Sequence, residues 1–175
     1  SPASDEGMDP IAAAAFWGTR YNTDQSDPNV AVSFSNALRK IGSTDEAVNV
    51  MQKTSAQHPE NADVSLEYGK VLVDAGRAFE AVRHLENAMT QKPGDWKALS
   101  AYGVALDQIG EHESARRKYT EALTIAPGAV TVINNKGLSF AMDGNLSMAR
   151  ATLRQAASRA GGDARIRQNL ALVLA

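Results

Sequence analysis

The 175-residue sequence lacks cysteine altogether, which excludes disulfide bonds, thiolate metal ligands and a cysteine nucleophile. It has little net charge, −2 at neutral pH, which is too small for the basic surface expected of a nucleic-acid-binding protein. It also lacks an apolar run of bilayer-spanning length, and the apolar stretch at 11–17 has no basic start of the kind a signal peptide needs. We therefore expect a soluble chain with no transmembrane segment and no nucleic-acid partner.

The composition that is present is typical of globular domains, with 43% hydrophobic and 22% charged residues. The charges are unevenly distributed, since residues 1–30 hold five acidic residues and one arginine, whereas residues 146–175 hold five arginines and one aspartate. The two ends thus carry opposite net charges. This asymmetry is either an ordinary solvated surface or an orientation cue for a partner or a neighbouring copy.

The strongest pattern is an internal period of 34 residues. Small residues and prolines recur at this spacing in four columns: Pro59, Pro93 and Pro127; Gly42, Gly76, Gly110 and Gly144; Ala47, Ala81, Ala115 and Ala149; Ser35, Gly69, Gly103 and Gly137. Large residues form two further columns: Leu38, Leu72, Leu106 and Phe140; Met51, Leu85, Tyr119 and Leu153. Agreement of so many columns in one register predicts a protein built from stacked repeats.

Each period divides into two predicted helices, as the third unit illustrates. One apolar face, at three- and four-residue spacings, ends before Gly110, and a second apolar stripe follows it. Gly110 suits a helix C-terminus because it can take the left-handed conformation, and Pro127 closes the second helix because it cannot donate the next ladder hydrogen bond. Gly103 and Ala115 are small, so we expect the two helices to approach closely.

Residues at fixed places in each unit form a family pattern. In the second unit these residues are Tyr68, Gly69, Leu72, Ala81, Leu85, Ala88 and Pro93. The pattern resembles that of the tetratricopeptide-repeat (TPR) family, which implies an all-α helical-hairpin solenoid, coiled into a right-handed superhelix, that binds proteins. We predict four full repeats at 28–61, 62–95, 96–129 and 130–163. Departures from the pattern at Thr54, Lys136 and Gly161 fall in the outer repeats, which are often atypical.

The N-terminal flank continues the same register. Counting back one period from the second-helix columns reaches Ala13 and Trp17, so residues 9–27 are predicted to hold an N-terminal capping helix. Asp9 is its expected N-cap, followed by a proline at the first helical position. Residues 1–8 are predicted to be disordered.

The C-terminal flank also continues the register. Counting forward one period from Gly137 reaches Ala171, so residues 164–175 are predicted to be the first helix of a truncated fifth repeat. Its apolar residues need either a second helix or a binding partner. Self-association through this helix is one possibility.

Four stretches carry a more specific pattern: 163–174 (DARIRQNLALVL), 151–157 (ATLRQAA), 65–72 (SLEYGKVL) and 106–110 (LDQIG). Together they resemble the TPR lipoproteins of the Tad (Flp) pilus assembly system, the TadD-like family. This resemblance implies a periplasmic, outer-membrane-associated factor that assists the outer-membrane secretin. The sequence contains neither a signal peptide nor a lipidated cysteine, so a lipid anchor outside this chain is implied by the resemblance alone.

Binding in a solenoid is expected on the concave face, lined mainly by the first helix of each repeat. The candidate groove residues are Asn36, Glu67, Lys70, Asn134, Asn135, Gln168 and Asn169. Asn135 and Asn169, one period apart, are expected to hold the backbone of an extended peptide, because an amide offers a donor and an acceptor. Alternatively, they are ordinary solvated residues. Val32 and Ser33 replace the polar clamp of TPR cochaperones, which disfavours a receptor for a chain-terminal carboxylate.

Catalytic alternatives find little support in the sequence. His58, His84 and His112 are predicted on a loop, a second helix and a turn, with no spacing suited to a metal or a serine. Gly161-Gly162 is predicted to end a helix rather than to cradle a phosphate. We therefore predict a non-enzymatic scaffold without cofactor or metal. It is either a Tad pilus assembly factor or a cytoplasmic adaptor or regulatory subunit that binds an extended peptide.

Overall fold

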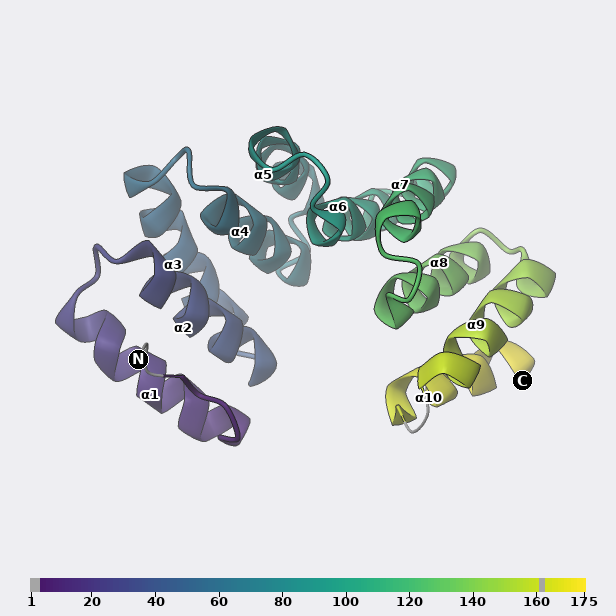
Figure 1. Cartoon of the computed structure of the whole chain (residues 1–175), viewed down its shortest axis with the longest axis horizontal. Coiled ribbons are helices and arrows are strands. Elements are labelled where there is room, and N and C mark those ends of the chain that lie inside the picture. Colours follow the sequence, from purple (N-terminus) through teal and green to yellow (C-terminus); the bar gives the residue numbers. More distant parts are fainter. Residues whose placement is uncertain (1–3, 161–162) are drawn as a thin grey trace. The chain divides into compact units, whose positions relative to one another are not determined.

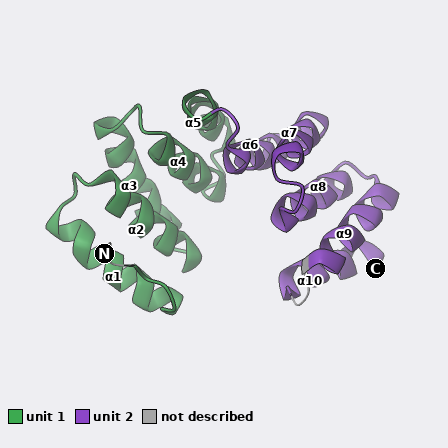
Figure 2. Ribbon diagram, viewed as in Figure 1, with its two compact units in different colours: residues 1–92 green, residues 93–175 purple. Residues whose placement is uncertain are grey.

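The computed structural model describes residues 4–160 and 163–175, which form helices joined by turns (Figure 1). Within these residues the helices are α1 Pro10–Thr23, α2 Pro28–Lys40, α3 Thr44–Gln57, α4 Ala62–Asp74, α5 Ala78–Gln91, α6 Trp96–Gln108, α7 His112–Ile125, α8 Val130–Met142, α9 Leu146–Ala160 and α10 Ala164–Leu174. The described part of the chain contains no strand, so the all-α prediction is confirmed. Two compact units are distinguished, unit 1 (residues 1–92) and unit 2 (residues 93–175) (Figure 2).

Helix ends follow from local side-chain chemistry. The predicted N-cap is confirmed, since an Asp9 carboxylate oxygen accepts a hydrogen bond from Ala12 N at 2.9 Å. Gly110 ends α6 with a φ of 87°, the left-handed conformation that the sequence predicts. Residues 1–3 of the predicted disordered segment and the Gly161-Gly162 turn lie outside the described residues. The repeat boundaries and the right-handed superhelix stay predictions.

Unit 1 contains α1 to α5, in which each helix packs against the next and α2 also contacts α4. The α1–α2 contact is built from small residues, because Ala13 and Ala14 pack on Ala37 with Trp17 beside them. These short side chains bring α1 close to α2. The capping helix thereby shields the first full helix pair.

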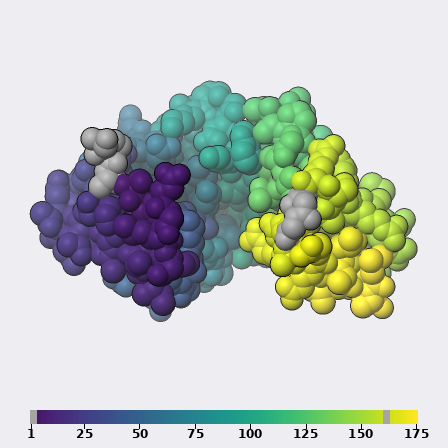
Figure 3. All heavy atoms as spheres, turned by 60° about the horizontal axis from the view of Figure 1, so that its bottom comes forward, coloured from purple at the N-terminus to yellow at the C-terminus, as the bar shows by residue number. Residues whose placement is uncertain are grey.

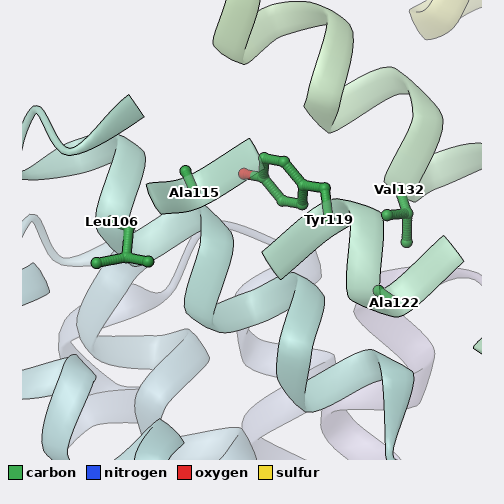
Figure 4. Close-up of a cluster of buried hydrophobic side chains, with 5 residues drawn as sticks. All are labelled: Leu106, Ala115, Tyr119, Ala122 and Val132. Atoms are coloured by element: carbon green, nitrogen blue, oxygen red, sulfur yellow. The ribbon is translucent and has the colours of Figure 1, made fainter. Parts of the chain in front are cut away.

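Unit 2 contains α6 to α10, again with each helix against the next, and α8 contacts both α6 and α10. Its main hydrophobic cluster consists of Leu106, Ala115, Tyr119, Ala122 and Val132 (Figure 4). The cluster draws residues from three consecutive helices, so no hairpin of this unit has a complete core by itself. In the space-filling view α10 lies against α9 (Figure 3).

The small-residue column has a more specific cause than close approach of two backbones. A Cβ at Gly103 would lie 2.5 Å from Tyr119 Cε1, and one at Gly137 would lie 2.7 Å from Leu153 Cδ2. Gly69 stands in the same relation to Leu85. Each glycine therefore accommodates the large side chain that the second helix of its own hairpin sends across.

Candidate functional site

The candidate groove residues lie on the helices that the repeat pattern assigns as first helices. They are Asn36 on α2, Glu67 and Lys70 on α4, Asn134 and Asn135 on α8, and Gln168 and Asn169 on α10. Four of them are partly buried and Gln168 is exposed. The prediction that Glu67 and Asn134 are exposed is wrong, since each is only 4% exposed.

Glu67 is buried because it pairs with an arginine that the sequence analysis did not single out. Arg39 Nη1 lies 2.9 Å from Glu67 Oε1, and Arg39 Nε lies 2.8 Å from Asp74 Oδ2. Burial raises the pKa of Glu67 above its usual range, although the nearby Arg39 and Lys70 charges oppose that shift. Glu67 therefore ties α4 to α2 and does not offer a free carboxylate to a partner.

Asn134 is buried because a second amide covers it. Asn169 Nδ2 on α10 donates to Asn134 Oδ1 on α8 at 3.1 Å. Within the described residues, Asn134 Nδ2, Asn169 Oδ1 and the partly buried Asn135 amide make no hydrogen bond. The structure thus brings three of the predicted amides together on adjacent helices of unit 2. Gln168 precedes Asn169 on α10 and stays exposed.

A buried hydrogen-bond network in unit 2 was not predicted from the sequence. The Asp107 carboxylate accepts from Tyr119 Oη at 2.8 Å and from Ser139 Oγ at 2.7 Å, and His112 Nδ1 lies 2.8 Å from it. Burial, reinforced by the Asp107 charge, raises the pKa of Tyr119 far above its usual range. One aspartate thereby links α6, α7 and α8.

This network contains a serine, a histidine and an aspartate but has the geometry of a structural tie. The Ser139 hydroxyl is fully buried and donates to Asp107, not to the ring of His112. His58 Nε2 lies 2.9 Å from a backbone oxygen, that of Ser26. No group of three or more His or acidic side chains that could hold a metal occurs in the described residues.

Comparison with known proteins agrees with the geometry. A family profile described as tetratricopeptide repeat matches residues 33–81 and 69–130, together more than half of the chain. The comparison with curated proteins found no match.

Solved structures of TPR proteins share the fold. TTC0263 of Thermus thermophilus has a TM-score of 0.84 at 18% identity, over 94% of this chain and 90% of its own. MamA from Desulfovibrio magneticus has a TM-score of 0.68 at 19% identity, over 89% and 88%. YrrB, described as a TPR protein with an unusual peptide-binding site, has a TM-score of 0.64 at 22% identity, over 90% and 80%.

These similarities concern the fold, since all three identities are low. TPR proteins are generally non-enzymatic scaffolds that bind proteins or peptides. No helix among the described residues is long and apolar enough to cross a membrane. On the family match and the repeated helix pairs, the chain belongs to the tetratricopeptide-repeat family.

Proposed function

We propose that this TPR protein binds an extended segment of a partner protein on α8 and α10, around the Asn134–Asn169 pair. A peptide unit carries one N–H donor and one C=O acceptor. Asn134 Nδ2 and Asn169 Oδ1 are the complementary donor and acceptor, held in place by the 3.1 Å bond between the other two atoms of the pair. Because the pair is already formed in the free chain, binding orders few additional side chains. This pair is the observation that carries the proposal.

Neighbouring residues of α8 offer contacts for the side chains of such a segment. Asn135, Leu138 and Met142 follow at three- and four-residue spacings, so they share one face of the helix. Leu138 is partly buried, whereas the Met142 side chain is 58% exposed. An extended peptide directs alternate side chains to one side, so a segment with apolar residues at alternate positions suits this face.

We further propose that the partner belongs to the Tad (Flp) pilus machinery, with the outer-membrane secretin as the first candidate. The protein then acts in the periplasm at the outer membrane, held by a lipid anchor outside this chain. The support is the resemblance of residues 163–174, 151–157, 65–72 and 106–110 to the TPR lipoproteins of that system. The Asn134–Asn169 pair connects one of these regions to the proposed peptide surface, since Asn169 lies within 163–174.

The test is a pull-down from bacterial envelope extract with three baits. They are the wild-type chain, the Asn135→Ala/Asn169→Ala variant, and the matched control Asn36→Ala, which removes an amide from a first helix of unit 1. We expect the wild type and the control to recover a secretin and the double variant to lose it. Circular dichroism of all three baits checks that the fold is retained.

Each other outcome of the pull-down points elsewhere. Equal recovery by all three baits would move binding to another surface while keeping the pilus partner. If a partner sensitive to the double substitution comes only from cytosolic extract, the protein is an adaptor or regulatory subunit. If neither extract supplies a partner that the double variant loses, the peptide proposal is wrong.

A further inference from the structure

A shallow pocket of about 440 Å³ lies between α7 and α8 in unit 2. Its surface is mainly apolar and includes Phe140 from α8, over whose ring the Arg116 guanidinium carbon lies at 4.5 Å from the centroid. Charged side chains of both helices surround this apolar surface. The pocket contains none of the asparagines of the proposed peptide site.

The cations that α7 places in or beside this pocket are already paired with carboxylates. The pairs are Arg116–Asp143 at 2.7 Å, Arg117–Glu113 at 3.0 Å and Lys118–Glu121 at 3.2 Å. Lys136, from α8, also lines the pocket and is partly buried, but it makes no ion pair or hydrogen bond within the described residues. The pocket therefore holds one positive charge without a counter-charge among those residues.

Packing of the repeat does not require a lysine at this place. One and two periods earlier the same column holds Tyr102 and Tyr68, and one period later it holds Leu170. Tyr102 packs against the hydrophobic cluster of unit 2, which is the usual role of the column. A lysine with a long apolar stem can line the pocket while its ammonium group stays near the surface. Lys136 is thus a departure from the repeat that places charge where the other repeats have an apolar contact.

We propose that this cavity, the Lys136 pocket, binds the carboxylate of an aspartate or glutamate in a partner protein, next to an apolar side chain that covers Phe140. Charge complementarity selects the carboxylate, because Lys136 is the cation there that lacks a counter-charge among the described residues. The apolar neighbour removes water from the pocket, which strengthens the ion pair. The site goes beyond the proposed function and does not depend on it.

The test uses two blocked tetrapeptides, acetyl-Ala-Glu-Leu-Ala-amide and its Gln counterpart, together with sodium acetate. Each is titrated into the full chain while amide resonances of α7 and α8 are followed by NMR. We expect the Glu peptide to bind at least about fivefold more tightly than the Gln peptide and than acetate, with the shifts centred on Lys136 and Phe140. Raising the salt concentration should weaken the Glu peptide selectively.

Four variants sharpen this test. Lys136→Gln and Lys136→Tyr should each weaken the Glu peptide by about fivefold or more, and the tyrosine restores the residue of the neighbouring repeats, so its fold is expected to be intact. Lys97→Gln, which removes an exposed lysine from α6, should change binding by less than about twofold. Asn135→Ala/Asn169→Ala should bind the Glu peptide normally, which separates this site from the amide pair.

Three results would overturn the proposal. The first is equal affinity for the Glu and Gln peptides. The second is unchanged binding of the Glu peptide by Lys136→Gln. The third is acetate binding as tightly as the Glu peptide, which would show a site for a free carboxylate and no role for the apolar neighbour.

Discussion

Units 1 and 2 differ in how polar side chains tie their helices together. One column of the repeat holds Arg39, Val73, Asp107 and Ala141. In unit 1, Arg39 joins α2 to α4 through two carboxylates. In unit 2, Asp107 joins α6 to α7 and α8 by accepting hydrogen bonds from hydroxyl groups, with a histidine beside them.

The two ties also differ in their access to water. The side chains of Arg39 and Asp74 are 20% and 38% exposed, so water and a second carboxylate can compensate for a lost partner. The side chain of Asp107 is 5% exposed and Tyr119 is 1% exposed, so neither has a substitute partner. Burial without an alternative makes the loss of a hydrogen-bond acceptor expensive. The comparison therefore predicts that unit 2 depends more strongly on its tie than unit 1 does.

The largest expected effect is that of Asp107→Ala. It strands the buried Tyr119 and Ser139 hydroxyls, so the free energy of unfolding of unit 2 should fall by about 3 kcal/mol. The measurement is urea unfolding followed by the fluorescence of Trp96, which packs on the unit 2 cluster, in a Trp17→Phe background. The exposed carboxylate of unit 1 supplies the control, since Asp74→Ala should cost less than about 1 kcal/mol.

A double variant checks that the loss comes from the stranded hydroxyl. Adding Tyr119→Phe to Asp107→Ala removes one unsatisfied group, so the pair should be less destabilised than the sum of the single variants. Additive effects would contradict the network interpretation.

The next largest effect compares glycines of the two units. Gly103→Ala should cost about 2 kcal/mol, because the Tyr119 ring that it meets is fixed by its bond to Asp107. Gly69→Ala meets Leu85, an aliphatic side chain that can change rotamer, so we expect about 1 kcal/mol. Thermal unfolding by circular dichroism measures both, and an equal loss would show that the hydrogen bond does not hold the ring.

A smaller effect is expected for Glu67→Gln in unit 1. Arg39 keeps Asp74 as its partner, and the substitution removes a carboxylate whose burial is unfavourable, so the loss should be about 1 kcal/mol or less. Urea unfolding in a Trp96→Phe background, where Trp17 reports on unit 1, tests this value. A loss as large as that of Asp107→Ala would remove the contrast between the two ties.

The smallest effect is a pH dependence in unit 1. His84 stacks on Tyr68 with ring centroids 4.5 Å apart, and burial lowers the pKa of His84 below its usual value. The unfolded chain then binds more protons, so the His84 contribution to stability is complete above the unfolded pKa near 6.5 and is lost as the pH falls from there to the lowered folded pKa. His84→Phe keeps a ring against Tyr68 and should flatten the pH profile of urea unfolding. Parallel profiles of wild type and variant would contradict this assignment.

Features that depend on near neighbours in the chain could be predicted from the sequence. Asp9, Gly110 and the apolar spacing of α6 act over one or two helical turns, and the structure confirms their effects. The errors concern side chains whose partners lie about one period away. Glu67 meets Arg39, and Asn134 meets Asn169, through contacts between first helices of successive repeats. Exposure estimated from one helix therefore missed both pairs.

The Asp107 network left only a weak signal in the sequence. Asp107 stands in a column that is apolar at Val73 and Ala141, and Tyr119 replaces the leucine of the neighbouring hairpins. Both departures occur in the same hairpin, twelve residues apart, which is the separation across which the tyrosine hydroxyl reaches the carboxylate. Ser139 could not be inferred, because its hydroxyl enters from α8, whose approach depends on packing of the whole unit.

The sequence by itself determined the repeat, the helix pairs and the family, because a 34-residue period of small and large residues encodes how each helix packs on the next. The tertiary structure alone decided which polar residues are spent on internal ties and which remain for a partner. Glu67 and Asp107 are occupied, whereas Lys136 and one donor and one acceptor of the Asn134–Asn169 pair are not, within the part of the chain described. That division depends on side chains from different repeats meeting in space, which no spacing along one helix specifies.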